Sequence, residues 1–194
     1  MNRWLSITLG VVASGFLVAA CSMGVSEPQR VGLEPPSMMS PSTRNPTLEE
    51  YMKIVGPAAQ KVEHGQLKLD GHPVSCGTRP TVMNAELDSW GGAFPGYVIL
   101  NPDRLKGLST PVKFYIYHHE CGHQFIGASE TAADCYSIRN GVKRGWLDDR
   151  GMTDICTFIS KLKGDRVHPP GPDRCKQMRQ CYAEALGKNR QASR

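Results

Sequence analysis

The sequence lacks several patterns that assign chains to common classes. It has no Cys-x-x-Cys pair, the spacing typical of structural zinc sites and of thioredoxin-like redox sites. Its 23 basic and 18 acidic residues are scattered, and the one basic cluster is Lys188, Arg190 and Arg194, where we expect a solvated tail. No internal repeat is visible. These absences argue against a cysteine-dependent redox protein, a nucleic-acid-binding protein and a solenoid.

A single long apolar run begins the chain. It follows the cation Arg3 and extends from Trp4 to Ala20 without a charged residue. Such a run is short for a full membrane span and is typical of a secretory leader. We therefore expect residues 1–20 to be a signal peptide and the rest of the chain to be exported.

The leader ends in Val18-Ala19-Ala20-Cys21, which resembles the lipobox of bacterial lipoproteins. In that family the cysteine becomes the acylated first residue, which implies that Cys21 carries lipid and anchors the chain to a membrane. A serine at the next position, here Ser22, usually accompanies sorting to the outer membrane, on its periplasmic face. The alternative is an ordinary signal peptide with Cys21 unmodified.

The cysteines that remain after Cys21 is set aside are even in number. In an exported chain this favours a framework of up to three disulfides, whose pairing the sequence leaves open. The residues are Cys76, Cys121, Cys135, Cys156, Cys175 and Cys181.

A tether follows the leader, at residues 21–46. This stretch contains several serines and too few apolar residues to form a buried face, so it cannot offset the entropy of ordering. Proline keeps such a segment semi-extended, which suits a spacer between a lipidated end and a folded domain. Its prolines are Pro28, Pro35, Pro36, Pro41 and Pro46. We place the folded domain at residues 47–190.

The first part of the domain predicts one helix and a small sheet. Thr47-Leu48-Glu49-Glu50 has the form of a capping box and opens a helix that we expect to reach Ala59. Glycine and proline are dense over the next part of the chain and leave room for short strands only. We expect these strands at residues 67–69, 81–83 and 97–100.

The second part of the domain predicts four helices. Thr110-Pro111 places an N-cap and a favoured first-turn proline ahead of residues 112–126, whose apolar positions recur with helical spacing. Further helices are expected at residues 129–141, 153–162 and 172–186. The predicted fold class is α+β, mainly helical, with a small sheet before the helix at 112–126.

That helix carries the segment His119-Glu120-Cys121-Gly122-His123. Residues four apart lie on one face of a helix, so His119 and His123 can both reach one ion, with Glu120 to the side of the pair. The pattern is typical of metallopeptidases, in which zinc lowers the pKa of a water molecule and the glutamate acts as general base. We therefore expect zinc as the cofactor and Glu120 as the catalytic residue.

A pair of carboxylates, Glu130 and Asp134, lies one turn apart at the start of the next predicted helix. Gly127 is suited to end the preceding helix in a left-handed turn, which folds the second helix back toward the two histidines. We expect Glu130 to be the third metal ligand and Asp134 to accept a hydrogen bond from a ligand histidine. The alternative is a helix-start charge with a solvated neighbour.

Residues 95–146 resemble the gluzincin metallopeptidases. The resemblance rests on the HECGH segment together with Glu130-Thr131-Ala132-Ala133-Asp134-Cys135, because bacterial members read His-Glu-x-(Gly/Ala)-His and then Glu-x-x-Ala-Asp-Cys. It implies a zincin-like fold, a zinc cofactor and Glu130 as a ligand. One departure is the link of six residues between His123 and Glu130, which is shorter than gluzincins usually have. In metzincins, where the spacing is similar, the third ligand would fall at Ser129, a poor ligand.

In zincin folds an edge strand ahead of the metal helix pairs its backbone with an extended substrate. Residues 96–102 occupy that place in this chain, and the alternative is an internal strand that packs on the helix. His118 is expected to be a packing or surface residue, because it points away from the other two histidines of its helix. A disulfide that joins the two metal-motif helices is expected for Cys121 and Cys135.

Three other histidines lie near turn residues and are expected at the surface, although one of them could stabilise the reaction's oxyanion. They are His64, His72 and His168.

Two functions from different classes follow from these features. The first is a membrane-tethered zinc metallopeptidase that hydrolyses protein or peptide substrates in the bacterial cell envelope. The second is a non-catalytic envelope lipoprotein in which the metal, or the helix pair alone, organises a binding surface.

Overall fold

The computed structural model describes residues 44–192, with side chains up to residue 188. The predicted signal peptide, the predicted lipidation site Cys21 and most of the predicted tether lie outside the described residues. Within this range, no helix combines the length and the apolar character that crossing a membrane requires.

The first helix, α1 (Leu48–Val55), begins with the predicted capping box. The backbone N–H of Thr47 donates to the Glu50 carboxylate at 2.8 Å, and the backbone N–H of Glu50 donates to the Thr47 hydroxyl at 3.3 Å. The predicted extension to Ala59 is wrong. Gly56 adopts a positive φ of 65° and a proline follows it, so the chain passes through a single 3₁₀ turn into a strand.

A four-stranded sheet has the order β1-β4-β6-β5. Its strands are β1 (Ala59–Val62), β4 (Thr81–Asn84), β5 (Gly91–Phe94) and β6 (Tyr97–Leu100). The central pair β4 and β6 is parallel, and the two outer pairings are antiparallel. A separate hairpin joins β2 (Lys68–Leu69) to β3 (His72–Pro73). The strands predicted near 67–69, 81–83 and 97–100 are confirmed, whereas β1, β3 and β5 were not predicted.

All residues of β6 are buried, and its side chains alternate between the two faces of the sheet. Val98 and Leu100 join the main core formed with the helices, and Tyr97 and Ile99 join a smaller cluster under α1. The internal position is therefore the correct one for this segment, and its assignment as an edge strand is wrong. The edge that lies nearest the metal-motif helix belongs to β5.

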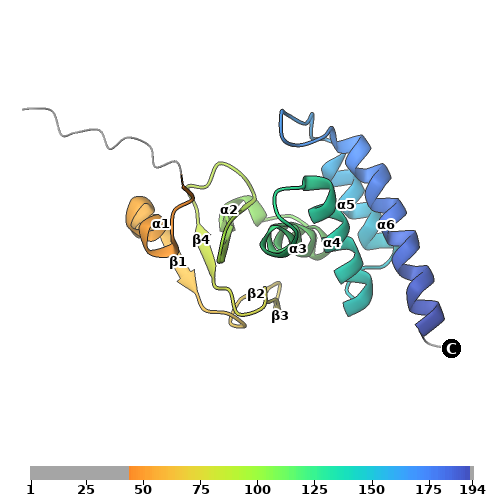
Figure 1. The fold of residues 1–194 in the computed structure, drawn as a ribbon, viewed down its shortest axis with the longest axis horizontal. Coiled ribbons are helices and arrows are strands. Elements are labelled where there is room, and N and C mark those ends of the chain that lie inside the picture. The colour runs from red at the N-terminus through yellow and green to blue at the C-terminus, as the bar shows by residue number, and fades with distance from the viewer. Residues whose placement is uncertain (1–43, 193–194) are drawn as a thin grey trace, which may run out of the picture. The chain divides into compact units, whose positions relative to one another are not determined.

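The helix that carries HECGH, α3 (Thr110–Ile126), lies between the sheet and the three helices that follow it in the chain (Figure 1). A short helix, α2 (Pro102–Leu105), precedes it. On its far side are α4 (Glu130–Arg144), α5 (Asp149–Ile159) and α6 (Gly171–Ala192). The predicted α+β class, with a small sheet ahead of the HECGH helix, is confirmed.

Two helices extend past the glycine that was predicted to end them. In α4, a Cβ at Gly141 would lie 2.7 Å from the Leu147 side chain and 2.9 Å from Trp146, so this glycine serves close packing. The helix ends instead at Gly145, which has a φ of 74°. In α6, Gly187 lies in the interior of the helix. The helix α5 begins earlier than predicted because Asp148 caps it, accepting the Gly151 backbone N–H at 2.8 Å.

Three disulfides hold these elements together: Cys76–Cys121, Cys135–Cys181 and Cys156–Cys175. The predicted framework of three is confirmed, but the link between Cys121 and Cys135 is wrong. Cys121 on α3 is bonded to Cys76 in the segment ahead of β4. Cys135 on α4 is bonded to Cys181 on α6. In the chain-entropy account, loops of this length stabilise a fold by about 3 to 4 kcal/mol each. Such a framework indicates an oxidising compartment.

Candidate metal centre

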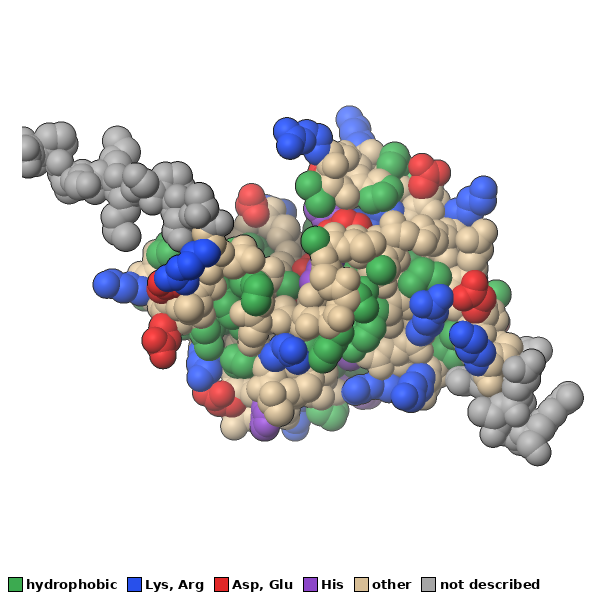
Figure 2. All heavy atoms as spheres, in the orientation of Figure 1, with side chains coloured by type: hydrophobic (Ala, Val, Ile, Leu, Met, Phe, Trp, Pro, Cys, Tyr) green, Lys and Arg blue, Asp and Glu red, His purple; other side chains and the backbone are tan. Residues whose placement is uncertain are grey.

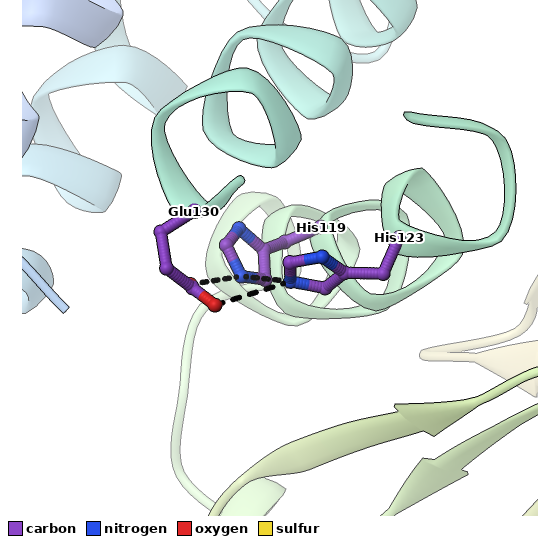
Figure 3. Close-up of side chains that lie close together, drawn as sticks. All are labelled: His119, His123 and Glu130. Atoms are coloured by element: carbon purple, nitrogen blue, oxygen red, sulfur yellow. Dashed lines mark hydrogen bonds and ion pairs between the residues drawn. The ribbon is translucent and has the colours of Figure 1, made fainter. Parts of the chain in front are cut away.

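Two imidazoles and one carboxylate converge where α3 meets the start of α4 (Figure 3). His119 and His123 project from the same face of α3, and Glu130 is the first residue of α4. The link between the helices is short because Gly127 takes a positive φ of 76° and Ser129 caps α4 through a hydrogen bond from Ala132 N–H. This turn returns Glu130 to the two histidines.

The spacing of the three side chains fits a tetrahedral metal ion. The Nε2 atoms of His119 and His123 are 3.2 Å apart, and the Glu130 carboxylate oxygens lie 3.1 Å from the first and 3.4 Å from the second. For zinc, ligand distances of about 2.0 to 2.2 Å place neighbouring ligand atoms about 3.3 Å apart in a tetrahedron. The three residues therefore form three corners of such a site.

Hydrogen bonds at Nδ1, the ring nitrogen farther from the centre, fix the orientation of both imidazoles. Nδ1 of His119 lies 2.8 Å from Oδ1 of Asp134, and Nδ1 of His123 lies 2.8 Å from the carbonyl oxygen of Gly127. A carboxylate and a carbonyl only accept hydrogen bonds, so both Nδ1 atoms carry hydrogen. In the neutral rings, the Nε2 lone pairs then point at the Glu130 carboxylate. Three groups that donate electron pairs therefore converge on one point, and a cation bound there would be coordinated by all three.

A proton at His119 compensates part of this charge in the metal-free chain. Burial by itself lowers the pKa of His119, but the hydrogen bonds to Asp134 and Glu130 outweigh burial and raise the pKa to about 9. Burial raises the pKa of Glu130, and its hydrogen bond with His119 brings the net pKa below its usual value. A bound metal ion would take the place of this proton.

Asp134 is held by a buried network that the sequence did not indicate. Tyr115 on α3 donates its hydroxyl to Asp134 Oδ1 at 2.6 Å, and Arg174 on α6 donates to the two carboxylate oxygens at 2.8 and 2.7 Å. The Arg174 guanidinium also donates to the Tyr115 hydroxyl at 2.9 Å. Although burial raises the pKa of Asp134, the hydrogen bonds from Arg174 and His119 lower it to about 2. Asp134 therefore stays ionised and orients the His119 ring.

Glu120 lies beside the three converging residues and faces the sheet. It lines the two cavities that meet at the centre, next to Gly91 of the edge strand β5. A Cβ at Gly91 would lie 2.8 Å from Glu120 Cγ, so the strand approaches this side chain as closely as glycine allows. Burial raises the pKa of Glu120, and the neighbouring His119 and His123 offset only part of that effect.

An open groove of about 760 Å³ runs past the centre. One wall is the backbone of β5 and the turn that follows it, and the other is α3 with the start of α4. Gln124 fixes this spacing, because its amide donates to the carbonyls of Phe94 and Tyr97 and accepts from Gly96 N–H. Acidic and histidine side chains lie at the bottom of a hollow on the face shown in Figure 2.

His168 approaches the centre from the loop between α5 and α6. Its Nε2 lies 3.4 Å from Glu130 Oε2, and its Nδ1 lies 3.0 and 3.1 Å from the two carboxylate oxygens of Asp165. Asp165 also accepts the backbone N–H groups of residues 167 and 168. His168 is thus partly exposed, as expected, but it faces the centre. Among the three histidines for which the sequence left a role beside the centre open, His168 is the one that faces it.

The other histidines lie away from the centre. His118 is buried, stacks on Trp146 with ring centroids 5.5 Å apart, and has its pKa lowered to about 3 by burial and by Arg144. It is a packing residue. His64 and His72 are exposed near the β2–β3 hairpin.

Comparisons with known proteins leave the family open: no protein-family model matches the chain, and no curated protein or solved structure matches it significantly.

Proposed function

We propose that this protein is a zinc-dependent peptidase of the bacterial cell envelope. The observation that carries the proposal is the convergence of two imidazole Nε2 atoms and one carboxylate at tetrahedral spacing, with a further glutamate beside them at an open groove. Two nitrogen ligands and one carboxylate are a donor set typical of catalytic zinc, which keeps its fourth position open. Bound there, zinc would supply Lewis-acid chemistry that lowers the pKa of a water molecule and polarises a carbonyl group.

We assign Glu120 the role of general base, because it lines the groove together with the three converging residues. In the proposed reaction its carboxylate accepts a proton from the attacking water and later delivers it to the departing amine nitrogen. His119, His123 and Glu130 hold the metal, and Asp134 keeps the His119 ring oriented. His168 faces the same space, and because its Nδ1 hydrogen is directed at the Asp165 carboxylate, its doubly protonated form is the one that can donate from Nε2 to the oxygen of the substrate carbonyl.

The groove suits an extended peptide. As an edge strand, β5 has backbone N–H and C=O groups that point away from the sheet. Two of its carbonyls already accept hydrogen bonds, that of Gly91 from the Ser89 hydroxyl and that of Phe94 from the Gln124 amide. Gly91 and Gly92 face opposite sides of the sheet, and a Cβ at Gly92 would meet no atom within 4 Å on the side away from Glu120. A peptide added to this edge would pass Glu120 with its backbone in reach of the centre.

The envelope location rests on the chain's N-terminal sequence and its disulfides. We propose that Cys21 is lipidated and that the domain is held at the periplasmic face of the outer membrane. Incorporation of a fatty-acid analogue into the wild-type chain, and its loss in Cys21→Ala, tests this independently of the enzymology. An ordinary secreted protein would carry no lipid in either form.

The activity is tested with the zinc-loaded chain and a peptide library. Glu120→Gln is expected to retain about one zinc ion per chain and to lose peptide cleavage, because the amide cannot accept the proton. Glu86→Gln, at an exposed position away from the groove, is the matched control and is expected to cleave like the wild type. A Glu120→Gln variant that cleaves at the wild-type rate would exclude the proposed base. Zinc binding without any cleavage by the wild type would favour the non-catalytic lipoprotein.

A further inference from the structure

One arginine in the groove that passes the centre is not neutralised by an ion pair in the part of the chain that the structure describes. This residue, Arg79, is also the only lysine or arginine among the described residues that line the groove. We propose that Arg79 binds a carboxylate of the substrate that lies two or three residues from the cleaved bond. The inference rests on the peptidase function proposed above.

The sheet places Arg79 at the end of the groove that lies away from Glu120. The carbonyl of the residue after Arg79 accepts the backbone N–H of Val98 at 3.2 Å, at the start of β6. Because β6 and β5 are antiparallel, the start of β6 lies beside the end of β5. Gly91, which approaches Glu120, is at the other end of β5. A strand of this length spans about 10 Å, which an extended peptide covers in about three residues.

The backbone of Arg79 is fixed to the helix that carries the metal ligands. Its N–H donates to the carbonyl of Cys76 at 3.1 Å and closes a turn in which Gly77 has a positive φ of 58°. Cys76 is joined to Cys121 on α3 by a disulfide. The arginine therefore starts from a segment that is covalently held beside α3, which reduces the entropic penalty of binding through it.

An aromatic stack holds the Arg79 side chain in place. Its guanidinium carbon lies 4.5 Å from the centroid of the Phe125 ring, which in turn stacks on Tyr136 with centroids 5.8 Å apart. A guanidinium that stacks through its face keeps its N–H groups, which lie in its plane, available for hydrogen bonds. These donors match the two oxygens of a carboxylate. Phe125 is 51% exposed, so the stack remains open to a ligand in the groove.

The charges of the groove make the preference specific to position. Glu120 and Glu130 are the only acidic residues among the described lining, and both lie at the centre. They repel a substrate carboxylate there, whereas neither pairs with Arg79. A carboxylate is therefore favoured at the Arg79 end of the groove and disfavoured beside the cleaved bond.

Peptides with blocked ends that carry one glutamate, glutamine or lysine test the selection with the zinc-loaded chain. The exchange is made at each position within three residues of the cleaved bond, on either side. Glutamate two or three residues from the bond is expected to lower KM about tenfold relative to glutamine, because it forms a charge-assisted pair with Arg79. Arg79→Gln should remove this difference, and Arg79→Glu should reverse it in favour of lysine.

Arg104→Gln, at an exposed position on α2 outside the groove, is the matched control and should keep the wild-type preference. Peptides that end two or three residues after the bond, with a free or an amidated C-terminus, identify the source of the carboxylate. A preference for the free end that Arg79→Gln removes assigns the pair to a chain terminus, and the glutamate preference assigns it to a side chain. Cleavage without preference for either carboxylate, or a preference that persists in Arg79→Gln, would overturn the inference and leave the proposed peptidase intact.

Binding to the metal-free chain tests the pair without catalysis. In calorimetric titrations, a blocked alanine peptide with a glutamate at each end is expected to bind about tenfold more tightly than its glutamine counterpart. The difference should shrink with added salt and vanish in Arg79→Gln, and Arg104→Gln should retain it. Equal affinity for the two peptides, no binding of either, or an undiminished difference in Arg79→Gln would overturn the inference even if the chain cleaved no peptide.

Discussion

Replacing Gly91 by alanine would displace the Glu120 side chain without removing its carboxylate. The added Cβ would lie 2.8 Å from Glu120 Cγ, 3.1 Å from its Oε1 and 3.1 Å from Ile116 Cγ2. Ile116 is buried, so the glutamate must give way. Restoring an ordinary contact of 3.4 Å moves Glu120 by roughly 0.6 Å, and misplacement on the order of 1 Å can lower a rate about 100-fold. We expect Gly91→Ala to reduce kcat/KM by about 10- to 100-fold.

The same strand supplies the matched control. A Cβ at Gly92 meets nothing within 4 Å, so Gly92→Ala should retain activity and wild-type stability. Both variants should bind zinc like the wild type, because neither position contacts His119, His123 or Glu130 in this arrangement. Steady-state cleavage, zinc content and thermal unfolding are measured for all three chains. Equal activity of the two variants, or loss of zinc in Gly91→Ala, would refute the role of the strand in placing Glu120.

Three further predictions concern the support of the centre. Tyr115→Phe removes a hydroxyl donor to the Asp134 carboxylate and should weaken zinc binding about tenfold in a competition titration; Tyr97→Phe, on the other side of the sheet, should not. In the metal-free chain the raised pKa of His119, about 9, contributes stability that is fully present below its ordinary value of 6.5 and lost as the pH rises through 9. The free energy of unfolding should therefore fall by up to about 3 kcal/mol over that range, and a flat profile in chelator would contradict the assignment. Replacing both cysteines of Cys76–Cys121 by serine should lower the unfolding free energy by about 4 kcal/mol in denaturant titrations, whereas an unchanged midpoint would mean that the bond is absent.

The parts of the centre that depend on local geometry were predictable from the sequence. Helical periodicity places His119 and His123 on one face, and a glycine at position 127 allows the chain to turn back. These two rules bring Glu130 to the histidines despite the short link, because the turn needs only residues 127–129.

The remaining features depend on contacts between distant segments. Arg174 reaches Asp134 across 40 residues of sequence, through the packing of α6 on α4. Tyr115 lies at one of the regularly spaced apolar positions of α3, so the sequence predicts a core residue. It gives no indication that the Tyr115 hydroxyl contacts Asp134. Gly91 lies in a strand whose first three residues are small, without the β-branched and aromatic pattern of a typical strand, so neither β5 nor its edge position was predicted.

Disulfide pairing was unpredictable for a similar reason. Cys121 lies in the same motif as the ligands, which suggested a link to the neighbouring helix. Its side chain instead faces the segment ahead of β4, where it meets Cys76. The direction of a helical side chain relative to the rest of the fold is not contained in the spacing of two motifs.

X-ray absorption at the zinc edge of the purified wild-type chain tests the central claim most directly. The account predicts about one zinc ion per chain, with two imidazole nitrogens and a carboxylate oxygen at about 2.0 to 2.2 Å, and loss of one imidazole from the spectrum in His123→Ala. A chain that binds no zinc, or a zinc shell without two imidazoles, would contradict it.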